Sequence, residues 1–276
     1  MIASVLIGFA SASILCAQEP TSAQHPPPAT AGDTASHAVH DDLAKQLQNP
    51  FANLITVPLQ NISSFAVGPE DGRQNVLNIQ PVVPLHLGPD WNLLARPILP
   101  IAYTSVPESQ FGLGDLNLEP FLSPRRGGNL VWGAGVILGV PSATDDLLGT
   151  GKWTAGPSVA FFGLSGSWTF SAIINQQWSY AGDASRDDVS LFQLQPTIGY
   201  MLGHGWFIVS GPLISADWTA SSGQKWTVPA GAGVGRVFSI GGQRMNLQLE
   251  GYASVIQPDI GPGSMILLTY TLLFVR

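Results

Sequence analysis

Charged residues are scarce in this chain. Asp, Glu, Lys and Arg make up 11% of its 276 residues, whereas an ordinary soluble domain carries about 25%. The charges present are mostly acidic, with 18 Asp plus Glu against 11 Lys plus Arg and a formal net charge of −7. Binding to nucleic acid requires a basic surface that neutralises phosphates, so the composition argues against that function. The surface expected of a water-soluble protein is also missing.

Cysteine is almost absent, and the single one, Cys16, lies in an apolar segment at the start of the chain. The first 17 residues, MIASVLIGFASASILCA, are almost wholly apolar and are followed by a polar, Pro-rich stretch, so we predict a secretory signal peptide over 1–17. The basic residues that usually begin such a leader are lacking. A lipoprotein acceptor role for Cys16 is a weaker alternative, because the preceding Leu15 is bulky. Cleavage after Ala17 leaves no cysteine, which excludes disulfides and thiolate chemistry.

Long hydrophobic runs are missing after the leader. The longest, LVWGAGVILGVP at 130–141, falls short of the roughly 18 to 20 apolar residues that a membrane helix needs. The exported chain therefore either stays soluble in the periplasm or crosses a membrane as strands.

Strict alternation of apolar and polar residues is the main positive feature. In SWTFSAIINQQWSY, residues 167–180, most even positions are aromatic or aliphatic and most odd positions are polar. This period of two is typical of a strand with one apolar and one polar face. A membrane barrel turns the apolar face to lipid and the polar face to the lumen, so on this strand we expect Trp168, Phe170, Ile174 and Trp178 outside and Asn175, Gln177 and Ser179 inside.

Twelve such segments follow Phe51. Most have 12 to 15 residues, longer than the roughly 5 to 6 of soluble strands and sufficient for a tilted membrane strand. They are 53–67, 73–87, 91–105, 112–123, 130–141, 152–163, 168–180, 188–202, 206–219, 225–239, 244–256 and 264–275.

The connections between these segments alternate in kind. One set is tight, such as GPD at 88–90 and GHG at 203–205; the other is mostly longer and acidic, such as SATDDLLGTG at 142–151 and AGDASRDD at 181–188. Short periplasmic turns and longer outer loops are typical of outer-membrane barrels, and seven of the eight Trp residues, with Tyr180, fall near strand ends as interfacial girdles do. We therefore predict an all-β fold, a transmembrane antiparallel up-and-down β-barrel of about 12 strands over residues 51–276.

The segment between leader and barrel, 18–50, is predicted as a disordered linker with a short helix over DDLAKQLQNP, 41–50. Asp41 or Asp42 would cap this helix and Pro50 would stop it. Two interpretations remain open, a small plug in the barrel or a frayed periplasmic tail.

Several passages resemble one known family: LAKQLQNPFANLITVPLQN, LNIQPVVPLHLGPDWNLLARPILPI, GLGDLNLEPFLSP, PSATDDLLGTGKWTAGPSV and WSYAGDASRDDVSLFQLQPTIGY. They are similar, in order and spacing, to the outer-membrane β-barrel family named for the MetA pathway of phenol degradation, whose members are also labelled transporter or neuromedin U. The likeness covers about residues 41–276. It implies a Gram-negative outer-membrane barrel loosely associated with aromatic-compound catabolism, and it brings no catalytic residues with it.

The alternation also predicts a polar, amide-rich lumen, because polar groups inside a membrane protein are costly unless they meet water or partners. We expect Arg96 and Glu119 to form an ion pair there. Pairing residue 105 with 112 would place Arg96 opposite Phe121 and diagonal to Glu119. The predicted lumen-lining residues are Arg96, Asp115, Asn117, Glu119, Asn175, Gln177, Gln193, Gln195, Asp217, Lys225, Gln248 and Glu250.

Catalytic and cofactor motifs are not spelled out in the chain. GTGK at 149–152, GAGVGR at 231–236 and GLSGS at 163–167 each lack residues that a phosphate loop, a dinucleotide loop or a nucleophile elbow requires. We predict no enzyme, no cofactor and no metal site. Two functions remain: a passive channel for small solutes, aromatic or hydrophobic ones by family association, or a structural or adhesive barrel with a plugged lumen. Expected partners are outer-membrane lipid and lipopolysaccharide, and the barrel assembly machinery through the C-terminal strand SMILLTYTLLFVR.

Overall fold

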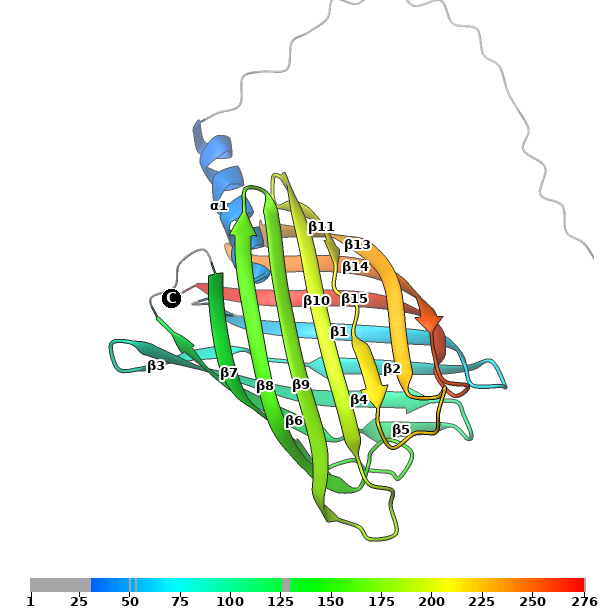
Figure 1. Cartoon of the computed structure of the whole chain (residues 1–276). Coiled ribbons are helices and arrows are strands. Elements are labelled where there is room, and N and C mark those ends of the chain that lie inside the picture. Colours follow the sequence, from blue (N-terminus) through cyan, green and yellow to red (C-terminus); the bar gives the residue numbers. More distant parts are fainter. Residues whose placement is uncertain (1–30, 50, 53, 126–129, 276) are drawn as a thin grey trace, which may run out of the picture.

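The computed structural model describes residues 31–49, 51–52, 54–125 and 130–275. Most of them belong to one antiparallel sheet that closes on itself (Figure 1). The predicted signal peptide over 1–17 lies outside the described residues. None of the helices in the described part of the chain is long and apolar enough to span a membrane.

One helix precedes the sheet and fifteen strand segments form it. The helix is α1, Ala31–Leu47. The first eight strands are β1 (Leu54–Val67), β2 (Gly72–Ile79), β3 (Val83–Leu87), β4 (Trp91–Thr104), β5 (Gln110–Leu113), β6 (Leu116–Pro124), β7 (Leu130–Val140) and β8 (Lys152–Ser165). The others are β9 (Trp168–Gly182), β10 (Ser190–Gly203), β11 (Trp206–Ser210), β12 (Ile214–Asp217), β13 (Trp226–Ile240), β14 (Gln243–Ile256) and β15 (Pro262–Val275).

The fifteen segments make twelve barrel strands, because three predicted strands are each broken into two pieces. The breaks fall at Pro81 between β2 and β3, at Gly114–Asp115 between β5 and β6, and at Gly211–Pro212 between β11 and β12. Proline has no N–H to give to a ladder and glycine weakens a strand interior. The predicted strands 73–87, 112–123 and 206–219 are therefore interrupted but stay in the same barrel positions.

Closure follows from two pairings. β1 pairs antiparallel with the last strand β15 along almost its whole length, from Leu54 opposite Val275 to Val67 opposite Pro262. β9 pairs with β10, which joins the two ends of the strand order. The predicted fold class, a closed antiparallel barrel of twelve strands, is confirmed.

The two faces of each strand differ as the alternation predicts. On β9 the side chains of Trp168, Phe170 and Trp178 are exposed on the outside, while Asn175 and Gln177 are buried inside. Large apolar side chains are exposed on most strands. In a lipid bilayer this outer surface is covered, whereas in water so large a patch would be a liability.

Helix α1 covers one end of the barrel. This end carries the tight turns and the C-terminus (Figure 1). Leu43 and Ala44 are buried against a cluster of barrel side chains. The barrel side of this cluster consists of Leu54, Met201, Phe207, Val209, Val237 and Leu273.

The helix is longer than the sequence predicted. It begins at Ala31, ten residues before the expected start at 41, so the predicted linker is wrong over 31–40. The Pro-rich stretch that suggested disorder ends at Pro28, and the alanines that follow favour helix. Asp41 is thus an interior residue of the helix, and its carboxylate accepts a hydrogen bond from the backbone N–H of Gly205 rather than capping α1.

Candidate pore

Two cavities lie inside the barrel. The outer cavity has a volume of about 440 Å³ and extends toward the long loops, with Leu213, Thr227 and Pro262 among its lining residues. The inner cavity, about 240 Å³, is bounded at its far end by residues 46–49 and Ala52, which lie at and after the end of α1. Five residues line both cavities, so their side chains form the layer between the two. The shared residues are Gln60, Gln80, Arg96, Ile173 and Gln195.

The centre of this separating layer is an ion pair. Arg96 Nη1 lies 2.7 Å from Glu119 Oε2, and the two side chains are 21% and 1% exposed. The predicted pair is therefore present, but the predicted register is wrong: Arg96 lies directly opposite Glu119, and Phe121 lies opposite Leu94. Near the loop the shift is three residues, because Thr104 pairs with Gln110 instead of Leu113, and the break at Gly114–Asp115 reduces it to two at Arg96.

Glu119 is satisfied at both oxygens. Its Oε1 accepts hydrogen bonds from Ser158 Oγ at 2.7 Å and from Asn175 Nδ2 at 3.3 Å, while Arg96 occupies Oε2. A buried carboxylate is tolerated when it has a countercharge and further donors. These contacts join β6 to β8 and β9 across the narrow bore.

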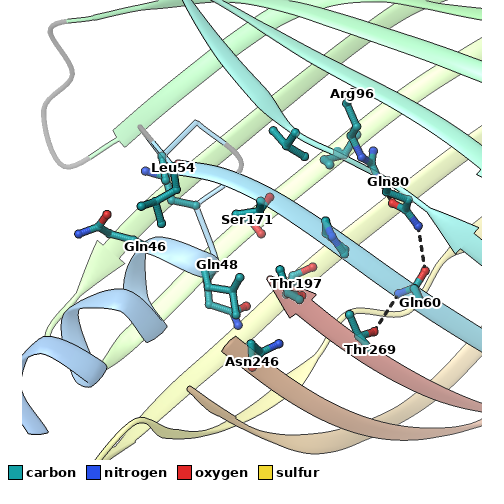
Figure 2. Close-up of a pocket in the computed structure, with 18 of the residues that line it drawn as sticks. Gln46, Gln48, Leu54, Gln60, Gln80, Arg96, Ser171, Thr197, Asn246 and Thr269 are labelled. Atoms are coloured by element: carbon teal, nitrogen blue, oxygen red, sulfur yellow. Dashed lines mark hydrogen bonds between the residues drawn. The ribbon is translucent and has the colours of Figure 1, made fainter. Parts of the chain in front are cut away.

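Arg96 extends the network in the other direction. Its Nη2 donates to Gln80 Oε1 at 2.9 Å, and Gln80 Nε2 donates to Gln60 Oε1 at 3.3 Å. Gln60 in turn donates to Thr269 Oγ1. Figure 2 shows these side chains following one another along the barrel wall. An arc of hydrogen bonds thus runs from β15 through β1 to β4 and on to β9.

A second arc crosses the opposite wall. Gln195 Nε2 donates to the carbonyl of Gly211, whose N–H donates to Tyr252 Oη at 2.8 Å. Tyr252 and Gln248 both contact the carboxylate of Glu250. This arc bridges the break between β11 and β12, where the backbone ladder is interrupted. We call the two arcs together the polar belt.

The predicted lumen-lining residues fall into three groups. Arg96, Asn117, Glu119, Asn175, Gln193 and Gln195 line the outer cavity. Gln248 lines the inner one, Glu250 is buried beside it, and Gln177 is buried on the inner wall with Thr154 Oγ1 as its hydrogen-bond donor. Asp115, Asp217 and Lys225 line neither cavity.

These last three lie at the outer ends of the strands. Asp115 occupies the break between β5 and β6, and its carboxylate accepts hydrogen bonds from the backbone N–H groups of Ala143 and Thr150. Asp217 ends β12 and binds Thr219, and its N–H donates to the carbonyl of Lys225. Alternation along an uninterrupted strand would have turned them inward. Asp115 leaves the inward row because the break interrupts its strand, whereas Asp217 and Lys225 lie at the end of β12 and just before β13, beyond the outer cavity.

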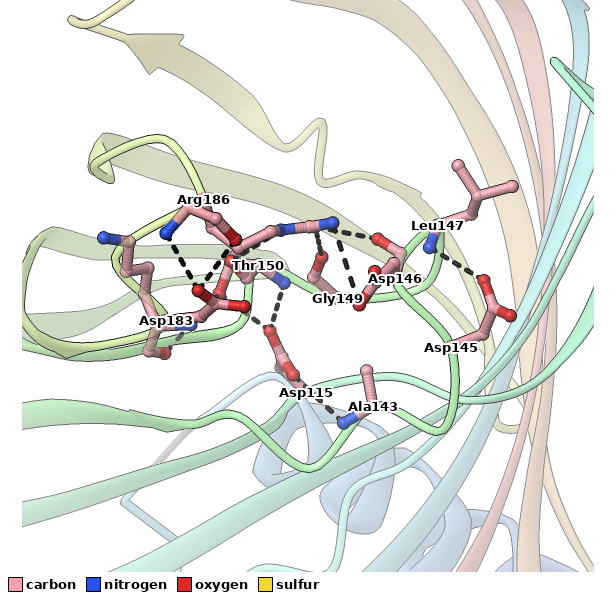
Figure 3. Close-up of polar contacts among 11 residues, drawn as sticks. Asp115, Ala143, Asp145, Asp146, Leu147, Gly149, Thr150, Asp183 and Arg186 are labelled. Atoms are coloured by element: carbon pink, nitrogen blue, oxygen red, sulfur yellow. Dashed lines mark hydrogen bonds and ion pairs between the residues drawn. The ribbon is translucent and has the colours of Figure 1, made fainter.

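The outer loops hold one another in place. Arg186, from the loop after β9, donates to the carbonyls of Asp146 and Gly149 in the loop after β7. Figure 3 shows this contact beside the one between Asp115 and Thr150. Within the same outer loop, the backbone N–H and the hydroxyl of Ser185 donate to Asp183 and lower the pKa of its carboxyl. The mouth of the barrel is therefore an ordered structure.

Sequence reasoning missed several members of the polar belt, namely Gln60, Gln80, Ser158 and Tyr252. Gln60 and Ser158 lie at inward positions of ordinary alternation, so the period of two contained the signal. Gln80 was concealed because the neighbouring Pro81 breaks the strand. In the described part of the chain no group of three or more His, Cys, Asp or Glu side chains is placed to hold a metal ion.

Comparison with known proteins identifies the family. The family model described as "Putative MetA-pathway of phenol degradation" matches residues 60–253. The chain belongs to this family. The resemblance seen in the sequence is thereby confirmed. None of the curated proteins matches the chain.

Solved structures with the same fold are outer-membrane barrels. An outer-membrane channel from Pseudomonas putida F1 is 19% identical, with a TM-score of 0.61 over 80% of this chain and 94% of that one. The NanC porin is 10% identical, with a TM-score of 0.50 over 80% and 100% of the two chains. At these identities the likeness shows that the barrel fold is shared.

Proposed function

We propose that the protein is an outer-membrane channel for the passive passage of small solutes. The observation that carries this proposal is the interior: two cavities in series, separated by a polar belt, inside a barrel whose outside is apolar. A structural barrel needs no such space, and its core would be filled by packed side chains. The family and the fold shared with an outer-membrane channel support the same function.

The solutes we propose are small, because the outer cavity of about 440 Å³ is at the lower end of ligand-pocket volumes. Aromatic or hydrophobic compounds are favoured by the description of the family. The cavity wall agrees with such solutes, since Ile62, Ile98 and Leu267 line it together with the polar side chains.

Localisation and partners belong to the same proposal. The chain would be exported by a signal peptide over 1–17 and inserted into the outer membrane of a Gram-negative bacterium. Outer-membrane lipid and lipopolysaccharide would surround its apolar face, and the C-terminal strand, β15, would be recognised by the barrel assembly machinery. We propose no catalytic role, which a phospholipase assay on purified protein tests.

The second candidate function is a structural or adhesive barrel with a plugged lumen. The observation in its favour is α1, whose Leu43 and Ala44 are buried in the barrel end. In the channel proposal the same helix narrows the pore. Solutes then pass either beside the helix or after it has moved.

Planar bilayers separate the two candidates. We expect discrete conductance steps from purified full-length protein, and larger steps after deletion of residues 41–50. If neither protein conducts, the channel proposal fails and the plugged barrel takes its place. Assembly of the deletion protein is checked by its resistance to unfolding in detergent.

A further inference from the structure

Glu250 is a buried acid in the polar belt with no cation beside it. Glu250 is 4% exposed, and it takes part in no ion pair among the described residues. Gln248 Nε2 donates to Oε1 at 2.7 Å, and the hydroxyl of Tyr252 contacts Oε2. Room for this side chain comes from the neighbouring strand, because a Cβ on Gly233 would lie 2.6 Å from Glu250 Cγ.

The donors around Glu250 favour the ionised form of its carboxyl group, against the cost of burying a charge. The N–H of Gly211 donates to Tyr252 Oη, and the hydroxyl of Tyr252 donates to Glu250 Oε2. An amide nitrogen donates to the other oxygen. A carboxyl group that only accepts hydrogen bonds is stabilised in its ionised form.

The charge of the belt is therefore unbalanced. It contains three charged side chains, Arg96, Glu119 and Glu250. Arg96 and Glu119 neutralise each other at 2.7 Å, whereas Gln248 and Tyr252 supply no charge. One negative charge remains at the layer that separates the two cavities, and low-dielectric walls focus its field into the bore.

We infer that Glu250 determines the charge preference of the channel and makes it favour cations. The class of solute that follows is small and neutral or amine-bearing, with carboxylates disfavoured. This inference rests on the proposed channel function. It assigns the preference to Glu250 and not to the ion pair or to the acidic outer loops, whose exposed charges are screened by salt.

The test is the reversal potential of single channels under a KCl gradient, measured on the full chain. We expect the wild type to prefer potassium over chloride. Glu250→Gln should lower the permeability ratio by about threefold or more, to near one. Tyr252→Phe is the matched control, because it removes a donor at the same place and keeps the charge, so its cation preference should persist.

A second variant separates Glu250 from the ion pair. Arg96→Gln combined with Glu119→Gln removes both charges together, and the cation preference should survive. An unchanged ratio in Glu250→Gln, or a loss of preference in the double variant, overturns the assignment while leaving the channel function standing. If the wild type conducts no ions, with or without residues 41–50, the channel function and this inference fail together. Proper assembly of each variant is read from its mobility on an unboiled gel.

Discussion

Arg96 and Glu119 lie directly opposite each other on adjacent strands, so each is held by both the sheet and its partner. Glu119 is almost completely buried and accepts hydrogen bonds from three donors, whereas the side chain of Arg96 is 21% exposed and lines the lumen. The two residues are therefore not equivalent. Losing the acid leaves a charged guanidinium facing the bore, while losing the base leaves a buried carboxylate.

Glu119→Gln should shift the ion selectivity of the channel toward anions, because Arg96 loses its countercharge. Breaking a buried ion pair lowers stability by about 3 to 5 kcal/mol. Because Arg96 contacts the lumen, we expect the loss in this variant to lie at the lower end of that range. Reversal potentials measure the shift. Glu70→Gln in the outer loop is the control and should change little in high salt, where exposed charges are screened. Equal effects of the two substitutions would contradict the pairing.

Ile174 and Gln193 test which side of the wall meets lipid. Ile174 belongs to the apolar face of β9, while Gln193 on β10 lines the outer cavity. An arginine at a lipid-facing position near the bilayer midplane costs about 2 to 4 kcal/mol, so Ile174→Arg should impair assembly and Gln193→Arg should not. Asn175 is a poorer control than the alternation suggested, because it is 8% exposed and donates to Glu119. Similar yields of folded protein from both variants would contradict the assignment of Ile174 to the lipid side and Gln193 to the lumen.

At the level of elements, the interruptions at Pro81, Gly114 and Gly211 create the site as much as the strands do. The first turns Gln80 into the lumen next to Arg96. The second frees Asp115 to hold the loop after β7. The third exposes the backbone of Gly211 to Gln195 and Tyr252. Regular ladders would leave none of these groups free to bind side chains.

Helix α1 is expected to control access from the end that it covers. Leu43→Asp puts a charge into the buried cluster at the barrel end, which costs several kcal/mol without a partner, so α1 should leave its site and conductance should rise. Val39→Asp is the control, since Val39 lies on the same helix and is 44% exposed. Bilayer recordings measure both. Unchanged conductance in Leu43→Asp would mean that α1 does not restrict the path.

The whole molecule is a sheet without edges. Because β1 pairs with β15, each of the twelve barrel strands has a neighbour on both sides for part of its length, although the segments β3 and β5 pair with β4 alone. In lipid such closure is required, since an unpaired backbone group has no water to bind. Glycine-rich strands such as β7 and β13 give space inside the closed wall for Phe51 and Phe207, which pack on Gly133 and Gly235.

Heat-modifiable migration is expected of the assembled protein. Unboiled protein in detergent should run faster on a gel than boiled protein, because a closed ladder resists detergent until it is heated. Far-UV circular dichroism of the unboiled sample should show mainly strand. A spectrum dominated by helix would contradict the barrel.

The sequence by itself determined the class of fold and its strand count. Alternation with period two is local and is repeated in twelve segments, so Trp168, Phe170 and Asn175 could be assigned to their faces without knowledge of any partner strand. The scarcity of charge and the sorted loops then indicated lipid. Arg96 and Glu119 were also found in this way, since each is an unusual residue at an inward position.

Only the tertiary structure decided the register, the strand breaks and the helix. A two-residue change in one hairpin moved the partner of Arg96 from Phe121 to Glu119, and pattern alone does not distinguish registers that differ by an even number because both keep the same faces. Asp115 lies in a strand break that the alternation did not reveal, and Asp217 and Lys225 lie at strand ends beyond the outer cavity. The surroundings of Glu250 also required the structure, because the N–H that donates to its partner Tyr252 belongs to Gly211, 41 residues before Tyr252.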